Sequence, residues 1–336
     1  MSSAPSFIHL RLHTEYSLLE GAVRLKKLPG MCADMGMPAV AVTDTNNMFA
    51  ALEFSVGALG AGVQPIVGCQ VDLMYQVAAP GEKAVRPAPI VLLAQNRAGY
   101  ESLMRLNSAI YLREPDYLHV TMVELAENAD GLICLTGGPD GPIGRLSRAG
   151  QRGKAEDLMR QLAEVFPGRL YVELQRHPEA DGELPLAERQ SERPAIEMAY
   201  AMDLPLVATN DVYFPKAEMY EAHDALICIA EGAYVDQQAD RRRLTQQHYL
   251  KTPAEMAALF ADLPEAIENT VEIARRCAFA VERHDPILPR FAEDEIEELR
   301  RQAKQGLEER LAVIEPAAPR EEYDERLEFE LGIIEG

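Results

Sequence analysis

An apolar strand that leads into a polar turn is predicted at His9-Leu10-Arg11-Leu12-His13-Thr14-Glu15-Tyr16-Ser17-Leu18-Leu19-Glu20-Gly21. Alternate side chains of an extended strand point to the same face, so residues 9, 11 and 13 share one side of it. Two imidazoles on one face suit a site for Zn, Mn or Fe, because neutral imidazole is a common ligand of these metals. Histidines that cap a turn or fill a core produce the same pattern, so this segment alone leaves both interpretations open.

Short apolar runs rich in β-forming residues recur along the chain. They cover residues 7–12, 39–43, 65–71, 89–94, 131–136, 170–174 and 206–209. Continuous apolar runs of this length are typical of strands buried on both faces of a parallel sheet, with helices or turns between them. The sequence therefore predicts an α/β fold.

Polar or ionisable residues follow several of these predicted strands. His13 follows the first, Asp44 the second, and Asp211 comes shortly after the last. In barrels of parallel strands the carboxyl ends of the strands and the loops after them form the pocket where chemistry occurs. Any site is therefore expected on that face.

Helices are predicted between the strands and again after the last of them. They cover residues 154–165, 195–201, 253–260, 264–277, 293–314 and 323–334, with Thr252 as an N-cap. Gly137-Gly138-Pro139-Asp140-Gly141 lacks the Lys and Ser/Thr of a phosphate-binding loop and is predicted to be a turn. No Ser-His-Asp or catalytic cysteine signature is present.

The charge balance argues against this chain as a primary nucleic-acid clamp. The 54 acidic residues exceed the 33 lysines and arginines, which gives a formal net charge of −21, whereas phosphate binding needs concentrated basic side chains. The one compact basic cluster, Arg241-Arg242-Arg243, is expected to be a solvated loop. An acidic surface is better suited to binding proteins.

Cysteine usage and hydropathy predict a cytoplasmic protein. The five cysteines lie singly in apolar segments and form no CxxC pair, which is typical of buried thiols in a reducing compartment. No apolar run approaches the roughly 20 residues of a spanning helix, and the N-terminus lacks the features of a secretory signal. No contact with a membrane is expected.

Five further segments, read in order with the first, carry a resemblance to a known family. They are Ala41-Val42-Thr43-Asp44-Thr45-Asn46-Asn47-Met48-Phe49, Pro65-Ile66-Val67-Gly68-Cys69-Gln70, Val91-Leu92-Leu93-Ala94-Gln95-Asn96, Tyr171-Val172-Glu173-Leu174-Gln175-Arg176-His177 and Val207-Ala208-Thr209-Asn210-Asp211-Val212-Tyr213. In this order the chain resembles the polymerase-and-histidinol-phosphatase (PHP) domain that opens the alpha subunit of bacterial DNA polymerase III. The resemblance implies a distorted (β/α)7 barrel of parallel strands over residues 1–285. Residues 323–336 resemble the start of the polymerase palm, so 286–336 is expected to be a mainly helical connector and a truncated palm.

Metal-binding members of this family use a His-x-His strand, an Asp-His pair, a Glu, a further His and an Asp-x-His. Matched position by position, this chain keeps His13, Asp44 and Asp211, and Glu173 and His177 are further candidates. The other positions hold Arg11, Thr45, Gln70, Pro89 and Tyr213. These ten residues are the vestigial metal-site positions that the resemblance implies.

The substitutions at these positions remove donors that a metal needs. A guanidinium is always charged and cannot ligate, and the other replacements are neutral or poor ligands, so no metal is expected. A metal that did bind would use His13, Asp44 and Asp211. We expect Arg11 to pair with Asp44 or Asp211 as a structural tie. The alternatives are that His13 is a hydrogen-bonded pocket residue, that both aspartates cap helices, and that His177 is a loop residue.

The resemblance also implies a parent function. It implies template-directed DNA synthesis in the full-length protein, with two Mg ions held by palm carboxylates beyond Gly336 and DNA bound by the rest of the chain. No catalytic residue is expected within this chain. It is expected to act as a scaffold and as a docking platform for the epsilon proofreading exonuclease, alongside other holoenzyme subunits.

Two enzymatic alternatives stay open. The first is a residual metal-dependent phosphoesterase, a 3'-5' exonuclease or a pyrophosphatase, which would use His13, Asp44, Asp211 and Glu173 to activate a water. The second is a free-standing enzyme of the histidinol-phosphatase kind, which shares the same ligand losses and does not explain the palm-like C-terminus.

Overall fold

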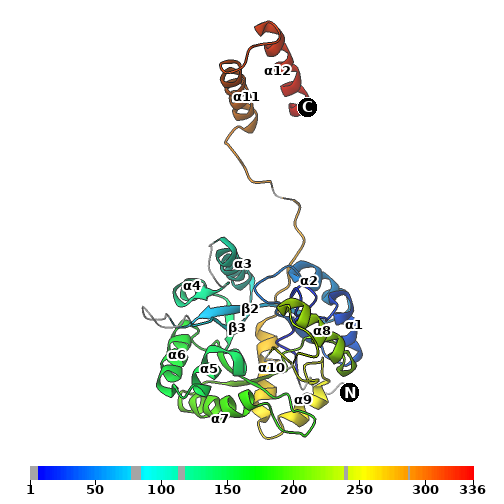
Figure 1. Cartoon of the computed structure of the whole chain (residues 1–336), viewed down its shortest axis with the longest axis vertical. Coiled ribbons are helices and arrows are strands. Elements are labelled where there is room, and N and C mark those ends of the chain that lie inside the picture. The colour runs from blue at the N-terminus through cyan, green and yellow to red at the C-terminus, as the bar shows by residue number, and fades with distance from the viewer. Residues whose placement is uncertain (1–6, 77–84, 113–117, 238–240, 287) are drawn as a thin grey trace. The chain divides into compact units, whose positions relative to one another are not determined.

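The structure, a computed structural model, describes residues 7–76, 85–112, 118–237, 241–286 and 288–336. The chain divides into two compact units, a larger unit of Met1–Glu282 and a smaller unit of Arg283–Gly336. Figure 1 displays the strands of the larger unit with helices around them. No helix in these ranges is both long and apolar enough to span a membrane.

Among the described residues of the larger unit, seven strands form one mixed sheet. They are β1 (Ala39–Val42), β2 (Gln64–Met74), β3 (Ala88–Ala94), β4 (Val120–Thr121), β5 (Leu132–Leu135), β6 (Leu170–Gln175) and β7 (Leu206–Thr209). Their order is β1-β2-β3-β5-β6-β7, and β4 pairs with β2 beside this path. Six of the seven predicted apolar runs are confirmed as strands, and the α/β class is confirmed with them.

The first predicted strand, residues 7–12, does not form a regular ladder, but its backbone connects the two edges of the sheet. On one side the carbonyl oxygens of His9 and Leu12 accept hydrogen bonds from Ala41 and Thr43, at 2.8 and 2.9 Å. On the other side the His13 amide donates to the carbonyl of Val212, just after β7, at 2.8 Å. This segment therefore links β1 to the end of β7 and curls the sheet into a distorted barrel.

The expectation that every strand is parallel is wrong at β3. This strand runs antiparallel to both β2 and β5, with Gly68 opposite Leu93 and Val91 opposite Leu135. All seven of its residues are buried, and a strand covered on both faces has the same apolar pattern whichever way it runs. The pattern therefore predicted the strand correctly and its direction incorrectly. The two-residue β4 was too short for its pattern to be recognised.

Helices of the larger unit cover the sheet from outside (Figure 1). They are α1 (Leu28–Asp34), α2 (Ala51–Gly60), α3 (Arg97–Leu112), α4 (Met122–Glu127), α5 (Pro142–Arg148), α6 (Arg152–Val165), α7 (Leu186–Ala201), α8 (Tyr220–Glu231), α9 (Pro253–Leu259) and α10 (Pro264–Arg276), with short 3-10 turns at Leu25–Lys27, Gly138–Asp140 and Ala217–Met219. The helices predicted at 154–165, 195–201, 253–260 and 264–277 are confirmed as α6, α7, α9 and α10.

Two local details explain helix boundaries in this unit. Thr252 caps α9 as predicted. Its side chain accepts a hydrogen bond from the Glu255 amide, and the Glu255 carboxylate accepts one from the Thr252 amide. Helix α7 begins nine residues earlier than the prediction and continues through Pro194. A proline inside a helix usually breaks it, which is why the sequence indicated only the part after Pro194.

The described part of the smaller unit forms the helices α11 (Glu295–Leu311) and α12 (Arg320–Glu335). They confirm the helices predicted at 293–314 and 323–334. The Asp294 side chain accepts from the Glu297 amide and caps α11. Arg300 of α11 pairs with Glu328 and Glu335 of α12, at 2.7 and 2.6 Å.

Candidate functional site

The polar strand ends converge on one pocket of about 1000 Å³. Seven of the ten predicted positions line it: Arg11, Thr45, Gln70, Pro89, His177, Asp211 and Tyr213. The remaining three, His13, Asp44 and Glu173, lie beneath its floor with at most 2% of their surface exposed. Pro89 is at the start of β3, and the antiparallel direction of that strand is what brings its first residues to the carboxyl ends of the others.

Arg11 is the centre of the ionic network below the pocket. Its Nε lies 2.9 Å from Asp211 Oδ1 and its Nη1 lies 3.1 Å from Glu173 Oε1. Its Nη2 donates to Gln70 Oε1 at 2.7 Å. Burial disfavours the guanidinium charge, but the two carboxylates outweigh burial and raise the pKa of Arg11. The predicted pairing of Arg11 with Asp211 is confirmed, and the alternative pairing with Asp44 is wrong.

Glu173 closes the second side of this network. Its Oε2 accepts from the Gly137 amide at 2.8 Å, and its Oε1 accepts from Gln175 Nε2 at 3.0 Å and from the Thr209 hydroxyl. Arg11 Nη1 also donates to the Gly137 carbonyl at 3.3 Å. Buried carboxylates are stable only when paired and hydrogen-bonded, and this one has both kinds of partner.

Asp44 is held by the loop that follows the first segment. It accepts from the Thr14 amide at 2.7 Å, from the Thr14 hydroxyl at 2.8 Å and from the Ser17 hydroxyl at 2.7 Å. Burial raises the pKa of Asp44, and these hydrogen bonds act in the opposite direction. Helix α2 starts after Ala50 with no side-chain cap, so the alternative that Asp44 caps a helix is wrong.

His13 has a partner at each ring nitrogen. Its Nε2 lies 3.1 Å from Asp211 Oδ1 and its Nδ1 lies 3.2 Å from Ser17 Oγ. The ring stacks on Tyr213 with centroids 4.3 Å apart. His13 is therefore hydrogen-bonded at both ring nitrogens, as one alternative expected, but it is buried beneath the pocket and does not line it.

Asp211 ties His13 and Arg11 together at the end of β7. Although burial would favour its neutral form, Arg11 and the His13 hydrogen bond hold the pKa of Asp211 well below its usual range. Its backbone has a φ of 47°, in the left-handed region that is costly for a residue with a Cβ. Its side chain points to Arg11 and caps no helix, so that alternative is wrong here too.

These residues do not fit a divalent metal in this arrangement. The oxygens of Asp44 accept from Thr14 and Ser17, and the guanidinium of Arg11 bridges Asp211 and Glu173. In the described parts of the chain, no three His, Cys, Asp or Glu side chains come close enough together to hold a metal ion. That these positions are remnants of a metal site stays a prediction.

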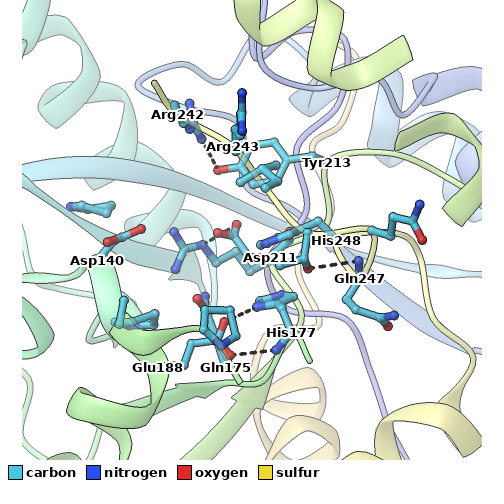
Figure 2. Close-up of a pocket in the computed structure, with 18 of the residues that line it drawn as sticks. Asp140, Gln175, His177, Glu188, Asp211, Tyr213, Arg242, Arg243, Gln247 and His248 are labelled. Atoms are coloured by element: carbon cyan, nitrogen blue, oxygen red, sulfur yellow. Dashed lines mark hydrogen bonds and ion pairs between the residues drawn. The ribbon is translucent and has the colours of Figure 1, made fainter. Parts of the chain in front are cut away.

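His177 is a loop residue, as the sequence suggested, but it is buried. Its Nδ1 lies 2.6 Å from Glu188 Oε1 and its Nε2 lies 2.5 Å from the Asn210 carbonyl. Its ring stacks on that of His248 with centroids 3.7 Å apart. Figure 2 labels both residues. Burial and the neighbouring His177 lower the pKa of His248 well below its ordinary value.

Sequence reasoning named the arginine triplet but did not place Arg242 and Arg243 in the pocket wall. Arg242 lies over the Tyr213 ring at 5.4 Å and donates to its hydroxyl at 3.1 Å (Figure 2). Arg241 forms a two-bond pair with Asp224 at 2.7 Å and its side chain is only 3% exposed. The solvated-loop interpretation is therefore wrong for Arg241, whereas the Arg242 side chain is 36% exposed. The arginine triplet itself was the signal, but its partners are distant in sequence.

A second buried network lies behind the pocket wall. His9 Nε2 bonds the Lys251 carbonyl at 2.8 Å, and Lys251 Nζ donates to Asn210 Oδ1 at 3.0 Å. Burial lowers the pKa of Lys251 to about 7 and that of His9 to about 4. His9 Nδ1 is buried and has no hydrogen-bond partner among the described residues, so a proton there would create an uncompensated charge.

This burial predicts a loss of stability in mild acid. Between pH 6.5 and about 4 the unfolded chain binds a proton at His9 that the folded chain does not, so the free energy of unfolding falls as the pH falls through this window. The shift corresponds to a loss on the order of 3 kcal/mol. Urea unfolding at a series of pH values measures it. His9→Gln, which can still donate to the Lys251 carbonyl, is the control and should lose less over the same window. Parallel curves for the two proteins would contradict the assignment to His9.

The chain is similar in sequence to a known domain family and to curated proteins. The PHP domain family model matches residues 9–177, about half of the chain. The DNA polymerase III subunit alpha of Caulobacter vibrioides is 47% identical over 334 residues, which cover 98% of this chain and 29% of that protein. The same subunit from Pseudomonas aeruginosa is 43% identical and covers 98% and 28%. Among solved structures, an amidohydrolase from Chromobacterium violaceum has a TM-score of 0.42 and 12% identity, covering 62% of this chain and 88% of that one.

The chain spans less than a third of the length of these curated relatives. It matches them along nearly its whole length, and the family model covers the first segment, the strands β1 to β6 and the predicted positions up to His177. The chain belongs to the PHP domain family.

Proposed function

We propose that this chain is the N-terminal region of the replicative DNA polymerase III alpha subunit and acts in DNA replication in the cytoplasm. In the full-length protein, template-directed DNA synthesis would take place in a palm domain whose carboxylates hold Mg ions. The relatives that are 47% and 43% identical carry this subunit name. Within this chain, we propose that the larger unit is a non-catalytic scaffold and a docking platform for the epsilon proofreading exonuclease and other holoenzyme subunits.

The observation that carries the scaffold role is the position of Arg11. Its guanidinium bridges Asp211 after β7 and Glu173 in β6, and it also contacts Gln70 in β2. A fixed cation at this place joins several strand ends, as a bound metal ion would, without providing an open coordination position for a substrate. The site therefore supports structure better than catalysis.

The docking role is supported by the charge of the chain. A formal net charge of −21 repels DNA and favours association with basic surfaces of proteins. The test is whether the purified chain forms a complex with the epsilon subunit of the same bacterium in size-exclusion chromatography and calorimetric titration. We expect a stoichiometric complex. Absence of binding at concentrations of about 10 μM, where even a micromolar complex would form, would sink the docking role.

The competing function is a residual metal-dependent phosphoesterase, and metal content separates it from the scaffold. Because the ligand oxygens and nitrogens already have protein partners, we expect less than about a tenth of a Zn, Mn or Fe ion per chain by elemental analysis. Chelation should leave both the melting temperature and any phosphodiester hydrolysis unchanged. A stoichiometric metal, with activity lost on chelation and in His13→Ala, would replace the scaffold with a working hydrolase.

A further inference from the structure

Large apolar side chains gather on the surface next to the pocket. Leu18, Phe49 and Tyr111 are 71%, 64% and 53% exposed, and together with Leu118 they line a groove of about 540 Å³. They come from separate parts of the chain: Leu18 from the loop after the first segment, Phe49 from the turn before α2, Tyr111 from the end of α3 and Leu118 from just before β4. Single exposed apolar residues are common on proteins, but a group that converges on one groove marks a binding surface.

The loop that presents Leu18 is fixed by the network under the pocket. Ser17 donates to Asp44 at 2.7 Å, and the Ser17 hydroxyl accepts from the Thr45 amide at 3.1 Å. A Cβ on Gly21 would lie 2.0 Å from the Thr14 carbonyl oxygen, so the loop closes tightly on itself. Leu19 has a φ of 62°, in the left-handed region that is unfavourable for a leucine. Strain of this kind persists where the surroundings fix a conformation that has a use.

The turn that presents Phe49 is fixed in a similar way. The Asn47 side chain donates to the carbonyls of Tyr16 and Thr45 at 2.9 and 3.0 Å and accepts from the Phe49 amide at 3.2 Å. Asn46 beside it also has a positive φ, 53°. Both apolar tips are therefore held in place before a partner arrives, which reduces the entropy lost on binding.

The charged residues around the groove indicate the chemistry of the partner. Glu20 and Asp72 line it, against the single basic lining residue Arg86 among those described. The exposed Glu53 bonds the Tyr16 hydroxyl beside the groove at 3.0 Å. An apolar groove with an acidic margin is complementary to apolar side chains flanked by lysine or arginine.

We propose that this groove is where the proofreading exonuclease subunit docks, through a segment with apolar side chains flanked by basic residues. The inference rests on the proposed docking function and adds the surface and the chemistry of the segment. It also gives the polar network a second purpose, because Asp44, Ser17 and Asn47 hold the two apolar tips that the partner contacts.

The test is calorimetric titration of the exonuclease subunit into the chain and into a Leu18→Ser/Phe49→Ser variant. We expect the variant to bind at least about tenfold more weakly, since buried apolar anchors are the residues on which binding energy concentrates. The matched control is Leu186→Ser/Tyr200→Ser on α7, whose residues are 61% and 58% exposed and lie outside the groove. It should bind like the unchanged chain. Raising the ionic strength from about 0.1 M to about 1 M should weaken binding.

A labelling measurement does not depend on these serine variants. All five native cysteines are buried, so a thiol introduced by Leu18→Cys reacts selectively with a maleimide, and mass spectrometry reports the extent. The exonuclease subunit should protect it, and should leave a thiol introduced by Leu186→Cys reactive.

The outcomes separate the inference from the function on which it rests. No binding by the unchanged chain would overturn both. Binding that is equal in the groove variant, or an unprotected thiol in the complex, would overturn the groove and leave docking in place. Protection of the thiol in the chain alone would mean that a second copy covers the groove, which also overturns the inference.

Discussion

Replacing Arg11 with methionine lowers the free energy of unfolding of the larger unit by about 3–5 kcal/mol, the usual cost of removing one partner from a buried ionic network. Arg11 is 2% exposed, and its removal leaves the carboxylates of Asp211 and Glu173 without a cation. Their mutual repulsion and the loss of water around them then oppose folding. Urea unfolding followed by circular dichroism measures the difference, provided that the slope with denaturant is unchanged.

Two further variants show whether the buried charge is the cause. Arg97→Met makes the same substitution at an arginine whose ion pair with Glu101 is exposed. It should change the free energy of unfolding by less than about 0.5 kcal/mol. Adding Glu173→Gln and Asp211→Asn to Arg11→Met removes the uncompensated charges and should restore part of the loss. If the triple variant is no more stable than Arg11→Met alone, packing rather than charge is what Arg11 contributes.

The sequence predicted six of the described strands, all except β4, because each of the six contains a continuous apolar run. β3 illustrates the limit, since Ala88–Ala94 is buried at every residue although it runs against its neighbours. Whether β3 runs parallel or antiparallel to its neighbours depends on the connection from β2 to β3, and the residue pattern within β3 does not contain this information. The first segment is another limit, because its hydrogen bonds go to β1 and to Val212 in single contacts that no local pattern specifies.

The location of the pocket was predictable, and its internal pairing was only partly so. Strand ends converge by topology, so ten sequence positions fall in or under one cavity. Arg11 pairs with Asp211 and not with Asp44, because the Asp44 carboxylate already accepts hydrogen bonds from Thr14 and Ser17 in the loop after the first segment. Arg242 and His248 lie between α8 and α9, and their positions depend on tertiary contacts, such as that of Arg242 with Tyr213, rather than on periodicity.

Gly137→Ala is expected to destabilise the larger unit by about 3–5 kcal/mol, through the sum of left-handed backbone strain, steric overlap and a weakened network. Gly137 has a φ of +86°, and a Cβ there would lie 1.8 Å from the Pro89 carbonyl oxygen and 2.8 Å from Gly141 Cα. Both contacts are backbone, so no side chain can rotate away. The same residue donates its amide to Glu173 and accepts from Arg11 through its carbonyl, so a shift that relieves the overlap also stretches these bonds.

A second glycine isolates the overlap from the strain. Gly182 has nearly the same φ, +85°, but a Cβ there would meet nothing within 4 Å. Gly182→Ala should therefore cost only the backbone term, about 1–2 kcal/mol. The difference between the two variants in urea unfolding measures what close approach around Gly137 contributes. If both variants lose the same free energy of unfolding, the backbone between β5 and α5 can shift at little cost, and the overlap around Gly137 does not disturb the ionic network. That result would contradict the prediction.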